Sequence, residues 1–157
     1  MQARRTILVI CTANICRSPM GERILRRLID RSPSAGTIEV ASAGVWAFSG
    51  EPACENAQKV MAERGIDLSD HRSRPLRQTD VDRADVLLVM THEHAQAIAT
   101  GFLRADGKVH LLSQMAGYPY DIEDPYGQPV DSYRATADQL ETLIAKGYPS
   151  ILRALGY

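Results

Sequence analysis

Two cysteines and an arginine near the start of the chain have types and spacing that could do chemistry. The stretch Ile7 to Glu22 is ILVICTANICRSPMGE, in which Arg17 comes six positions after Cys11. A cysteine thiolate is a nucleophile, and an arginine guanidinium can hold two oxygens of a phosphate group at once. A core cysteine followed by a surface arginine is the alternative, but it does not account for the arginine. The pattern therefore predicts that Cys11 attacks a phosphorus atom held by Arg17.

The residues between this cysteine and this arginine join a predicted strand to a predicted helix. Backbone N–H groups at such a junction can form an anion-binding nest, which the N-terminus of the helix reinforces. The same positive field favours the thiolate form of the cysteine. The predicted phosphate-binding loop comprises Thr12, Ala13, Asn14, Ile15, Cys16 and Ser18.

Strands and helices alternate along the sequence. Four mostly apolar runs, typical of strands that are buried on both faces, are Thr6–Cys11, Ile38–Ala43, Asp85–Met90 and Lys108–Leu112. Helical patterns follow the opening motif, span Cys54–Arg64 and Thr91–Thr100, and begin again near Ser132. Pro149 is expected to kink or split that last helix. This alternation predicts an α/β fold, with a parallel sheet in a three-layer sandwich.

Length and composition favour one globular domain over residues 1–157. The chain has 157 residues, of which 45% are hydrophobic, and a net charge of -1, so nothing suggests a nucleic-acid or membrane surface. The basic start followed by an apolar run resembles a signal peptide, but the run is short and is better interpreted as a first strand. Three cysteines cannot all pair within one chain, so we expect a reducing cytoplasm.

The longest irregular stretch is Gly117–Asp131, and loops of this length are often functional. It contains Asp124 directly before a proline. A carboxylic acid in a loop over the ends of the strands could protonate the oxygen that leaves from phosphorus. The alternative is that this aspartate only opens a turn, because Asp-Pro favours turns wherever it occurs.

The motif CTANICRSP resembles the signature C-x4-C-R-S/T of the low-molecular-weight protein tyrosine phosphatase family. Further segments resemble the same family in the same order, namely SAG at 42–44, DHRSRPL at 70–76, ADVLLVMTHEH at 84–94 and DPYG at 124–127. The resemblance covers essentially the whole chain. It implies a flavodoxin-like sandwich around a four-stranded parallel sheet ordered 2-1-3-4, which works without a metal or another cofactor. One departure is Ala13, where the family usually has glycine.

The resemblance also implies a role for each residue that matches the family. Cys11 matches the nucleophile, Arg17 the phosphate clamp and Asp124 the general acid. Ser18 matches the hydroxyl that donates to the thiolate. The residues that match the polar network supporting the loop are Asn14, Ser42 and His71. An ordinary core or surface histidine remains the alternative for the last of these.

The other two cysteines receive different predictions. Cys16 is either a buried packing thiol or a redox partner that captures oxidised Cys11 as a disulfide, and we favour the disulfide because both thiols share one tight loop. Cys54 has no basic neighbour in its predicted helix and is expected to be inert.

Aromatic and histidine residues near the motifs are further candidates. Trp46, Phe48 and Tyr126 are either core residues or walls for a flat substrate ring, and the wall is predicted for Trp46 and Tyr126. His92 and His94 could suggest a metal site, but their spacing at a helix start turns the rings apart. A solvated helix N-terminus is therefore predicted for these histidines.

Four functions compete. The first is hydrolysis of phosphotyrosine in proteins by a monomer or weak dimer, with a bacterial tyrosine kinase as one candidate substrate. The second is hydrolysis of phosphoarginine, because the second half resembles the arginine-phosphatase branch; Ile15 argues against it, since that branch typically has threonine there. A thiol-dependent arsenate reductase would need further cysteines near the third strand, and residues 72–100 contain none. A non-catalytic phosphoprotein-binding module would be expected to lack Cys11 or Asp124.

Overall fold

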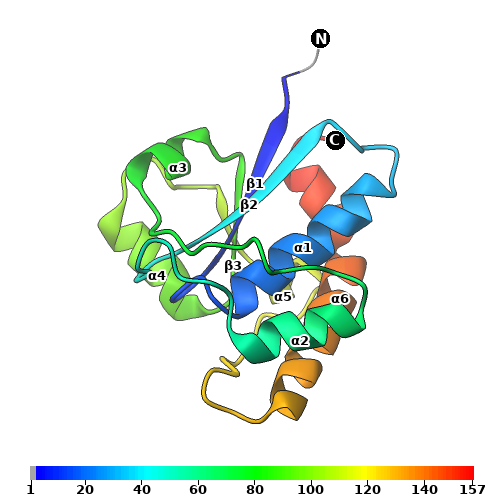
Figure 1. Ribbon diagram of the computed structural model, residues 1–157. Coiled ribbons are helices and arrows are strands. Elements are labelled where there is room, and N and C mark those ends of the chain that lie inside the picture. Colours follow the sequence, from blue (N-terminus) through cyan, green and yellow to red (C-terminus); the bar gives the residue numbers. More distant parts are fainter. Residues whose placement is uncertain (1–2) are drawn as a thin grey trace.

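A parallel four-stranded sheet forms the centre of the molecule in the computed structural model, which describes residues 3–157 (Figure 1). The strands are β1 (Arg5–Cys11), β2 (Ile38–Gly44), β3 (Val86–Val89) and β4 (Val109–Leu111). Their order is β2-β1-β3-β4, and all pairs are parallel, which confirms the predicted fold class. The chain leaves β1 toward β2 on one side and joins β3 on the other. Ligands bind at such a switch point, beyond the carboxyl ends of the strands, and Cys11 is the last residue of β1.

Helices cover both faces of this sheet (Figure 1). One face carries α1 (Arg17–Asp30), α2 (Glu55–Glu63), α5 (Leu112–Met115) and α6 (Val130–Ala154), and the other carries α3 (Gln78–Arg83) and α4 (His92–Gly101). The alternation of side chains along β1 explains the two layers. Ile7 and Val9 pack into the core beside α1 and α6, whereas Leu8 and Ile10 pack into the core beside α3 and α4. A strand buried on both faces therefore needs the continuous apolar run that the sequence has.

The last helix differs from the prediction. It starts at Val130 and continues through Pro149 to Ala154 as a single helix of 25 residues, so the predicted split does not occur. Close packing around this segment explains why the helix continues. At Gly147 a Cβ atom would lie 2.9 Å from the Cβ atom of Met115, so α6 and α5 touch almost backbone to backbone. Tertiary contacts of this kind can outweigh the single hydrogen bond that a proline removes.

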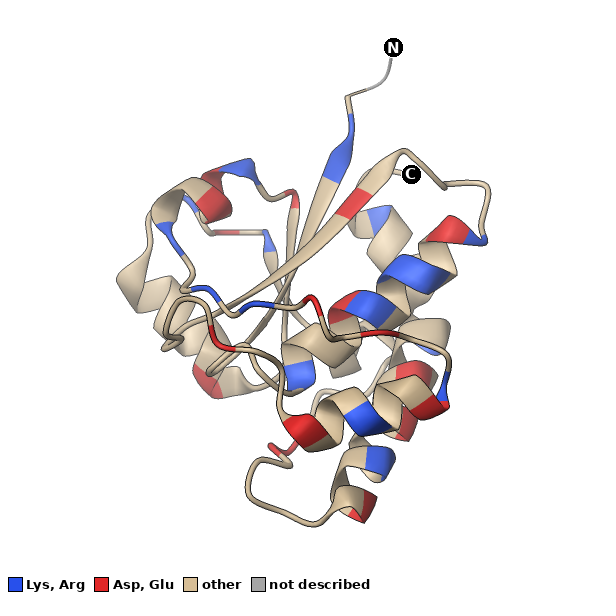
Figure 2. Ribbon diagram, in the orientation of Figure 1, with Lys and Arg blue, Asp and Glu red and all other residues tan. Residues whose placement is uncertain are grey.

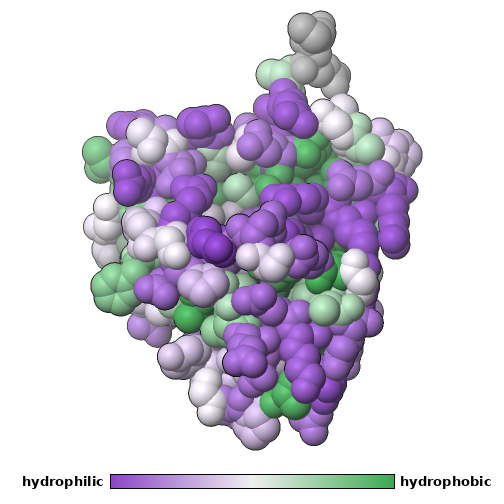
Figure 3. Space-filling model, viewed as in Figure 1, coloured by the Kyte–Doolittle hydropathy of each residue, from purple (hydrophilic) through white to green (hydrophobic). Residues whose placement is uncertain are grey.

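Charged residues of both signs are dispersed over the helices and loops (Figure 2). Hydrophilic side chains predominate on the face shown in Figure 3, and hydrophobic ones lie between them in small groups. None of the helices in the described residues combines the length and the hydrophobicity needed to cross a bilayer.

Candidate active site

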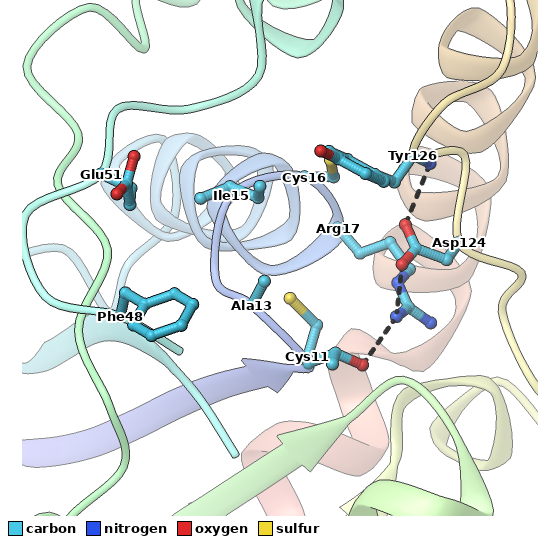
Figure 4. A pocket seen from close by; sticks show the side chains of 10 residues that line it. Cys11, Ala13, Ile15, Cys16, Arg17, Phe48, Glu51, Asp124 and Tyr126 are labelled. Atoms are coloured by element: carbon cyan, nitrogen blue, oxygen red, sulfur yellow. Dashed lines mark hydrogen bonds and ion pairs between the residues drawn. The ribbon is translucent and has the colours of Figure 1, made fainter. Parts of the chain in front are cut away.

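A cavity of about 420 Å³ opens where β1 ends and α1 begins (Figure 4). It brings together the predicted loop, the predicted acid and one predicted aromatic residue. Its lining residues are Cys11, Thr12, Ala13, Ile15, Cys16, Arg17, Phe48, Glu51, Asp124 and Tyr126.

The backbone of the loop after β1 separates its acceptors from its donors. The carbonyl of Thr12 accepts from the backbone N–H of Trp46 at 3.0 Å, and the carbonyl of Ile15 accepts from that of Cys54 at 2.9 Å. In contrast, the backbone N–H groups of residues 13–18 find no acceptor among residues 3–157. A loop with occupied carbonyls and unoccupied amides at a helix N-terminus can bind an anion.

Cys11 lies at the floor of the cavity with its sulfur 2.9 Å from the hydroxyl oxygen of Ser18. That hydroxyl oxygen accepts a hydrogen bond from the side-chain amide of Asn14 at 2.8 Å. Because the oxygen already accepts, its own hydrogen is free to point at the sulfur. The arrangement can stabilise a thiolate at Cys11, the form in which cysteine is a nucleophile.

Asn14 holds the loop in shape and is 0% exposed. Its φ of 59° lies in the left-handed region that asparagine tolerates. Its side-chain N–H groups donate to Ser18 and Ser42, the latter at 2.9 Å, while its side-chain oxygen accepts from the backbone of Arg74. Its carbonyl accepts from Nε2 of His71 at 2.7 Å, and burial lowers the pKa of that histidine. All residues of the predicted polar network thus meet at one asparagine.

Ala13, the departure from the family pattern, has no left-handed φ, so the alanine takes this place without backbone strain.

Gly44 is a structural requirement of the loop that the sequence analysis did not identify. A Cβ atom at this position would lie 2.5 Å from the carbonyl oxygen of Thr12 and 3.0 Å from the backbone nitrogen of Asn14. The end of β2 and the phosphate-binding loop can therefore touch only if residue 44 lacks a side chain. The SAG segment contained the signal, but the close approach is visible only in three dimensions.

Arg17 closes the cavity and is 4% exposed. Its Nη1 donates to the carbonyl of Ile122 at 2.8 Å, and its Nη2 lies 3.3 Å from Oγ1 of Thr12 and 3.4 Å from a carboxylate oxygen of Asp124. Its Nε is buried and has no hydrogen-bond partner among the described residues. A buried N–H donor without an acceptor is costly in a folded protein. An anion in the cavity can supply the acceptor.

Asp124 does two things at once (Figure 4). Its Oδ1 accepts from the backbone N–H of Tyr126 at 3.1 Å, which makes the predicted turn, while its Oδ2 faces Arg17. Its side chain is 46% exposed. The two interpretations of this aspartate are therefore compatible, since the turn aims the carboxylate at the cavity.

The aromatic walls differ in one residue from the prediction. Tyr126 and Phe48 line the cavity from opposite sides, whereas Trp46 is outside the lining and 54% exposed (Figure 4). Trp46 contributes its backbone N–H, which binds the loop carbonyl at residue 12, and this hydrogen bond leaves its ring outside. Two residues further along the chain, Phe48 takes the place predicted for the tryptophan. Glu51 lines the same side and was not predicted.

The cysteines are closer together than their sequence positions suggest. Cys16 lines the cavity with Cys11, and its sulfur also lies 2.6 Å from the sulfur of Cys54. Cys54, which was predicted to be inert, thus contacts a cysteine of the phosphate-binding loop, because the segment before α2 returns to this loop.

The two histidines of α4 also differ from each other. His92 is exposed and pairs with Asp121 at 2.8 Å. His94 is buried, and its Nε2 lies 2.8 Å from Oγ1 of Thr12. Burial and the charge of Arg17 lower the pKa of His94 to about 4. The prediction of a solvated pair is therefore wrong for His94, which contacts the phosphate-binding loop at Thr12.

Comparisons with known proteins match this geometry. The sequence profile described as low molecular weight phosphotyrosine protein phosphatase matches residues 6–153. The probable low molecular weight protein-tyrosine-phosphatase EpsP of Ralstonia nicotianae is 39% identical, over 97% of this chain and 99% of its own length. The protein-arginine-phosphatase of Geobacillus stearothermophilus is 41% identical, over 88% of this chain and 90% of its own length. A low molecular weight protein tyrosine phosphatase from T. tengcongensis superposes with a TM-score of 0.86 at 38% identity, over 93% of this chain and 99% of that chain.

Proposed function

Because the chain belongs to the low molecular weight phosphotyrosine protein phosphatase family, a family of phosphoric monoester hydrolases, we propose that Cys11, Arg17 and Asp124 hydrolyse phosphotyrosine in proteins. One observation carries the proposal. The backbone amides of residues 13–18 have no acceptor among residues 3–157, the buried Nε of Arg17 has no partner there either, and Cys11 and Arg17 line the same cavity. These donors suit a phosphate group whose phosphorus faces the sulfur.

The first half of the reaction transfers the phosphoryl group to the protein. The sulfur of Cys11 attacks phosphorus from the side opposite the ester oxygen, so an S–P bond forms as the P–O bond breaks. Arg17 and the loop amides hold the equatorial oxygens, on which charge is spread in the transition state. Asp124, in its protonated form, gives its proton to the leaving phenolate oxygen.

The second half returns the protein to its starting state. The carboxylate of Asp124 takes a proton from a water molecule, which attacks phosphorus while the S–P bond breaks. Inorganic phosphate leaves, and Cys11 is again a thiolate that the hydroxyl of Ser18 can stabilise. One carboxylate at the exposed edge of the cavity thus serves both halves.

The cavity walls favour an aromatic substrate. Tyr126 and Phe48 are 65% and 80% exposed and face each other across the opening, where a phenyl ring can lie between them. Ile15 adds an aliphatic surface and packs against the core below. A phenyl ring gains dispersion contacts from these three side chains and leaves no polar group unpaired.

Phosphoarginine is the second candidate, and Glu51 is the observation that favours it. This carboxylate lines the cavity beside Phe48, and it has no ion-pair partner among residues 3–157. It could accept from the N–H groups of a guanidino group. Ile15 opposes this substrate, because a β-branched apolar side chain offers such donors no acceptor.

The test compares kcat/KM on phosphotyrosyl and phosphoarginyl forms of one peptide. We expect the wild type to prefer phosphotyrosine, and Ile15→Thr to shift the ratio toward phosphoarginine by about 10-fold or more, since an unsatisfied donor costs about 1 to 3 kcal/mol. Ile15→Val is the matched control, because it keeps the branch without the hydroxyl. If the wild type prefers phosphoarginine, the argument from Ile15 is wrong and Glu51 is the residue expected to recognise the guanidino group. Glu51→Gln then tests that role, and it should lower kcat/KM on the phosphoarginyl peptide.

We also propose that the protein is a single domain that works in a reducing cytoplasm. Its substrates are proposed to include a tyrosine kinase. Its three thiols are free. A kinase that phosphorylates its own tyrosines would present exposed phosphotyrosine of the kind this open cavity admits. Dephosphorylation of such a kinase by the purified protein would support the assignment, and resistance of its phosphotyrosines would contradict it.

A further inference from the structure

The contact between Cys16 and Cys54 is not used by the phosphatase reaction. Their sulfur atoms lie 2.6 Å apart, and a disulfide needs about 2.05 Å, so a small movement suffices to join them. The backbone N–H of Cys54 donates to the carbonyl of Ile15 at 2.9 Å, which ties the two segments together next to the sulfurs. The hydroxyl of Tyr133 lies 3.8 Å from the sulfur of Cys16 on the other side.

The environment makes the two thiols unequal. The contact with Cys54 and burial raise the pKa of Cys16, whereas the contact with Cys16 lowers the pKa of Cys54. Cys54 is also the N-cap residue of α2, where a helix favours negative charge. Cys54 is therefore the nucleophilic member of the pair.

The three thiols form a series that starts in the cavity. Cys11 and Cys16 both line it, whereas Cys54 does not and lies behind Cys16. An oxidant that enters by the substrate route reaches Cys11, the thiol whose thiolate form the hydroxyl of Ser18 can stabilise. Only Cys16 touches both the cavity and the third thiol.

We propose that Cys54 is a resolving thiol that moves an oxidation from Cys11, through Cys16, to a Cys16–Cys54 disulfide. The proposal rests on the proposed nucleophile, Cys11. It differs from a simple trap at Cys16, because its end product leaves Cys11 reduced.

Three steps with hydrogen peroxide as the oxidant describe the transfer. The thiolate of Cys11 attacks one peroxide oxygen, so that an S–O bond forms, the O–O bond breaks, hydroxide leaves and the sulfur becomes a sulfenic acid. The sulfur of Cys16 then attacks the sulfur of Cys11; the S–O bond breaks, and the departing hydroxide takes the proton of Cys16 as water. Finally the thiolate of Cys54 attacks the sulfur of Cys16, and Cys11 leaves as a thiolate. Two thiols have been oxidised to one disulfide, and one peroxide has been reduced.

The experiment treats reductant-free protein with one equivalent of hydrogen peroxide, blocks free thiols at timed intervals with N-ethylmaleimide, and maps the disulfides by mass spectrometry. In the wild type we expect an early Cys11–Cys16 disulfide to give way to Cys16–Cys54. Hydrolysis of p-nitrophenyl phosphate is expected to fall and then to recover without added reductant. In Cys54→Ser the Cys11–Cys16 disulfide is expected to persist, with activity lost until dithiothreitol is added.

Untreated Cys54→Ser and Cys54→Ala are the controls, and both are expected to keep wild-type phosphatase activity. A persistent Cys11–Cys16 disulfide in the wild type, or equal recovery in Cys54→Ser, would overturn the relay. The activity of the untreated proteins tests the proposed function separately, because disulfide mapping does not depend on turnover.

Discussion

The two loops that meet over the cavity are built in opposite ways. The phosphate-binding loop is internal, with Asn14 fully buried and hydrogen-bonded to four other residues. The loop that carries Asp124 is a surface loop, with this side chain 46% exposed. The late loop is anchored just before the aspartate, at the buried Ile122, whose N–H binds the carbonyl of Met90 and whose carbonyl binds Arg17.

This difference matches what each loop is proposed to do. Donors that stabilise charge on a phosphate work best when they are fixed before the substrate arrives. An acid that serves first a leaving group and then a water molecule has to remain close to solvent. The comparison predicts that loss of a phosphate-holding or nucleophilic group in the phosphate-binding loop slows phosphate esters alike, whatever their leaving group. Damage to the late loop is expected to slow an ester according to its leaving group.

The largest effect is expected from Cys11→Ser. A serine at this position has no base to activate it, so turnover of p-nitrophenyl phosphate and of phosphotyrosyl peptide should both fall by about 10⁴-fold or more. Circular dichroism and the melting temperature should stay near those of the wild type, because the side chains differ by one atom. Substantial remaining turnover by a folded variant would contradict the nucleophile.

Asp124→Asn is expected to separate substrates. An amide cannot donate the proton, so an unactivated phenyl or alkyl phosphate should slow by about 10²- to 10³-fold, and an ester whose leaving group is already a stable anion by much less. Glu123→Gln is the matched control, since this neighbouring carboxylate lies outside the cavity lining. Equal slowing of both kinds of ester would reject the general acid.

Gly44→Ala tests whether the phosphate-binding loop depends on its neighbour in β2. The added methyl group would collide with the backbone at residues 12 and 14, and a displacement of this size can cost about 10²-fold in kcat. Activated and unactivated esters are expected to slow alike. The control is Gly101→Ala, where a Cβ atom meets nothing within 4 Å. If Gly44→Ala turned over normally, the close approach would not shape the loop.

The sequence was most informative where structure is local. The apolar run before Cys11 and the amphipathic run after Arg17 place both residues at a strand-to-helix junction, and both elements are present. Contacts between distant segments were harder to predict. The periodicity around residues 45–54 does not determine the path of that loop, so it could not distinguish Trp46 from Phe48 or bring Cys54 to Cys16. The short helices α3 and α5 were missed for a related reason, since six and four residues carry too little periodicity.

The smallest predicted effect concerns His94, which connects α4 to the phosphate-binding loop. Its titration should affect the stability of the protein rather than its turnover. Oγ1 of Thr12 accepts from Arg17, so its hydrogen can point to Nε2 of a neutral His94. Burial and then the charge of Arg17 lower the pKa of His94 from 6.5 to about 4, against the opposing charges of Asp121 and Asp124. The unfolded chain therefore binds a proton between about pH 6.5 and pH 4 that the folded chain does not, and the free energy of unfolding falls as the pH falls through this range.

The free energy of unfolding that His94 contributes at neutral pH and loses in acid would be about 3 kcal/mol, and the loss is complete below about pH 4. His94→Gln can keep the contact with Thr12 and cannot titrate, so its unfolding free energy, measured with urea from pH 7 to pH 4, should fall less steeply than that of the wild type. The exposed His92→Gln is the matched control on the same helix, and His71, whose pKa burial also lowers, contributes to the slope in all three proteins. A slope unchanged in His94→Gln would mean that His94 does not titrate differently in the folded and unfolded chains. The contact between His94 and Thr12 would then add nothing to the pH dependence of the protein's stability, and the difference between the two loops would rest on the Asn14 network alone.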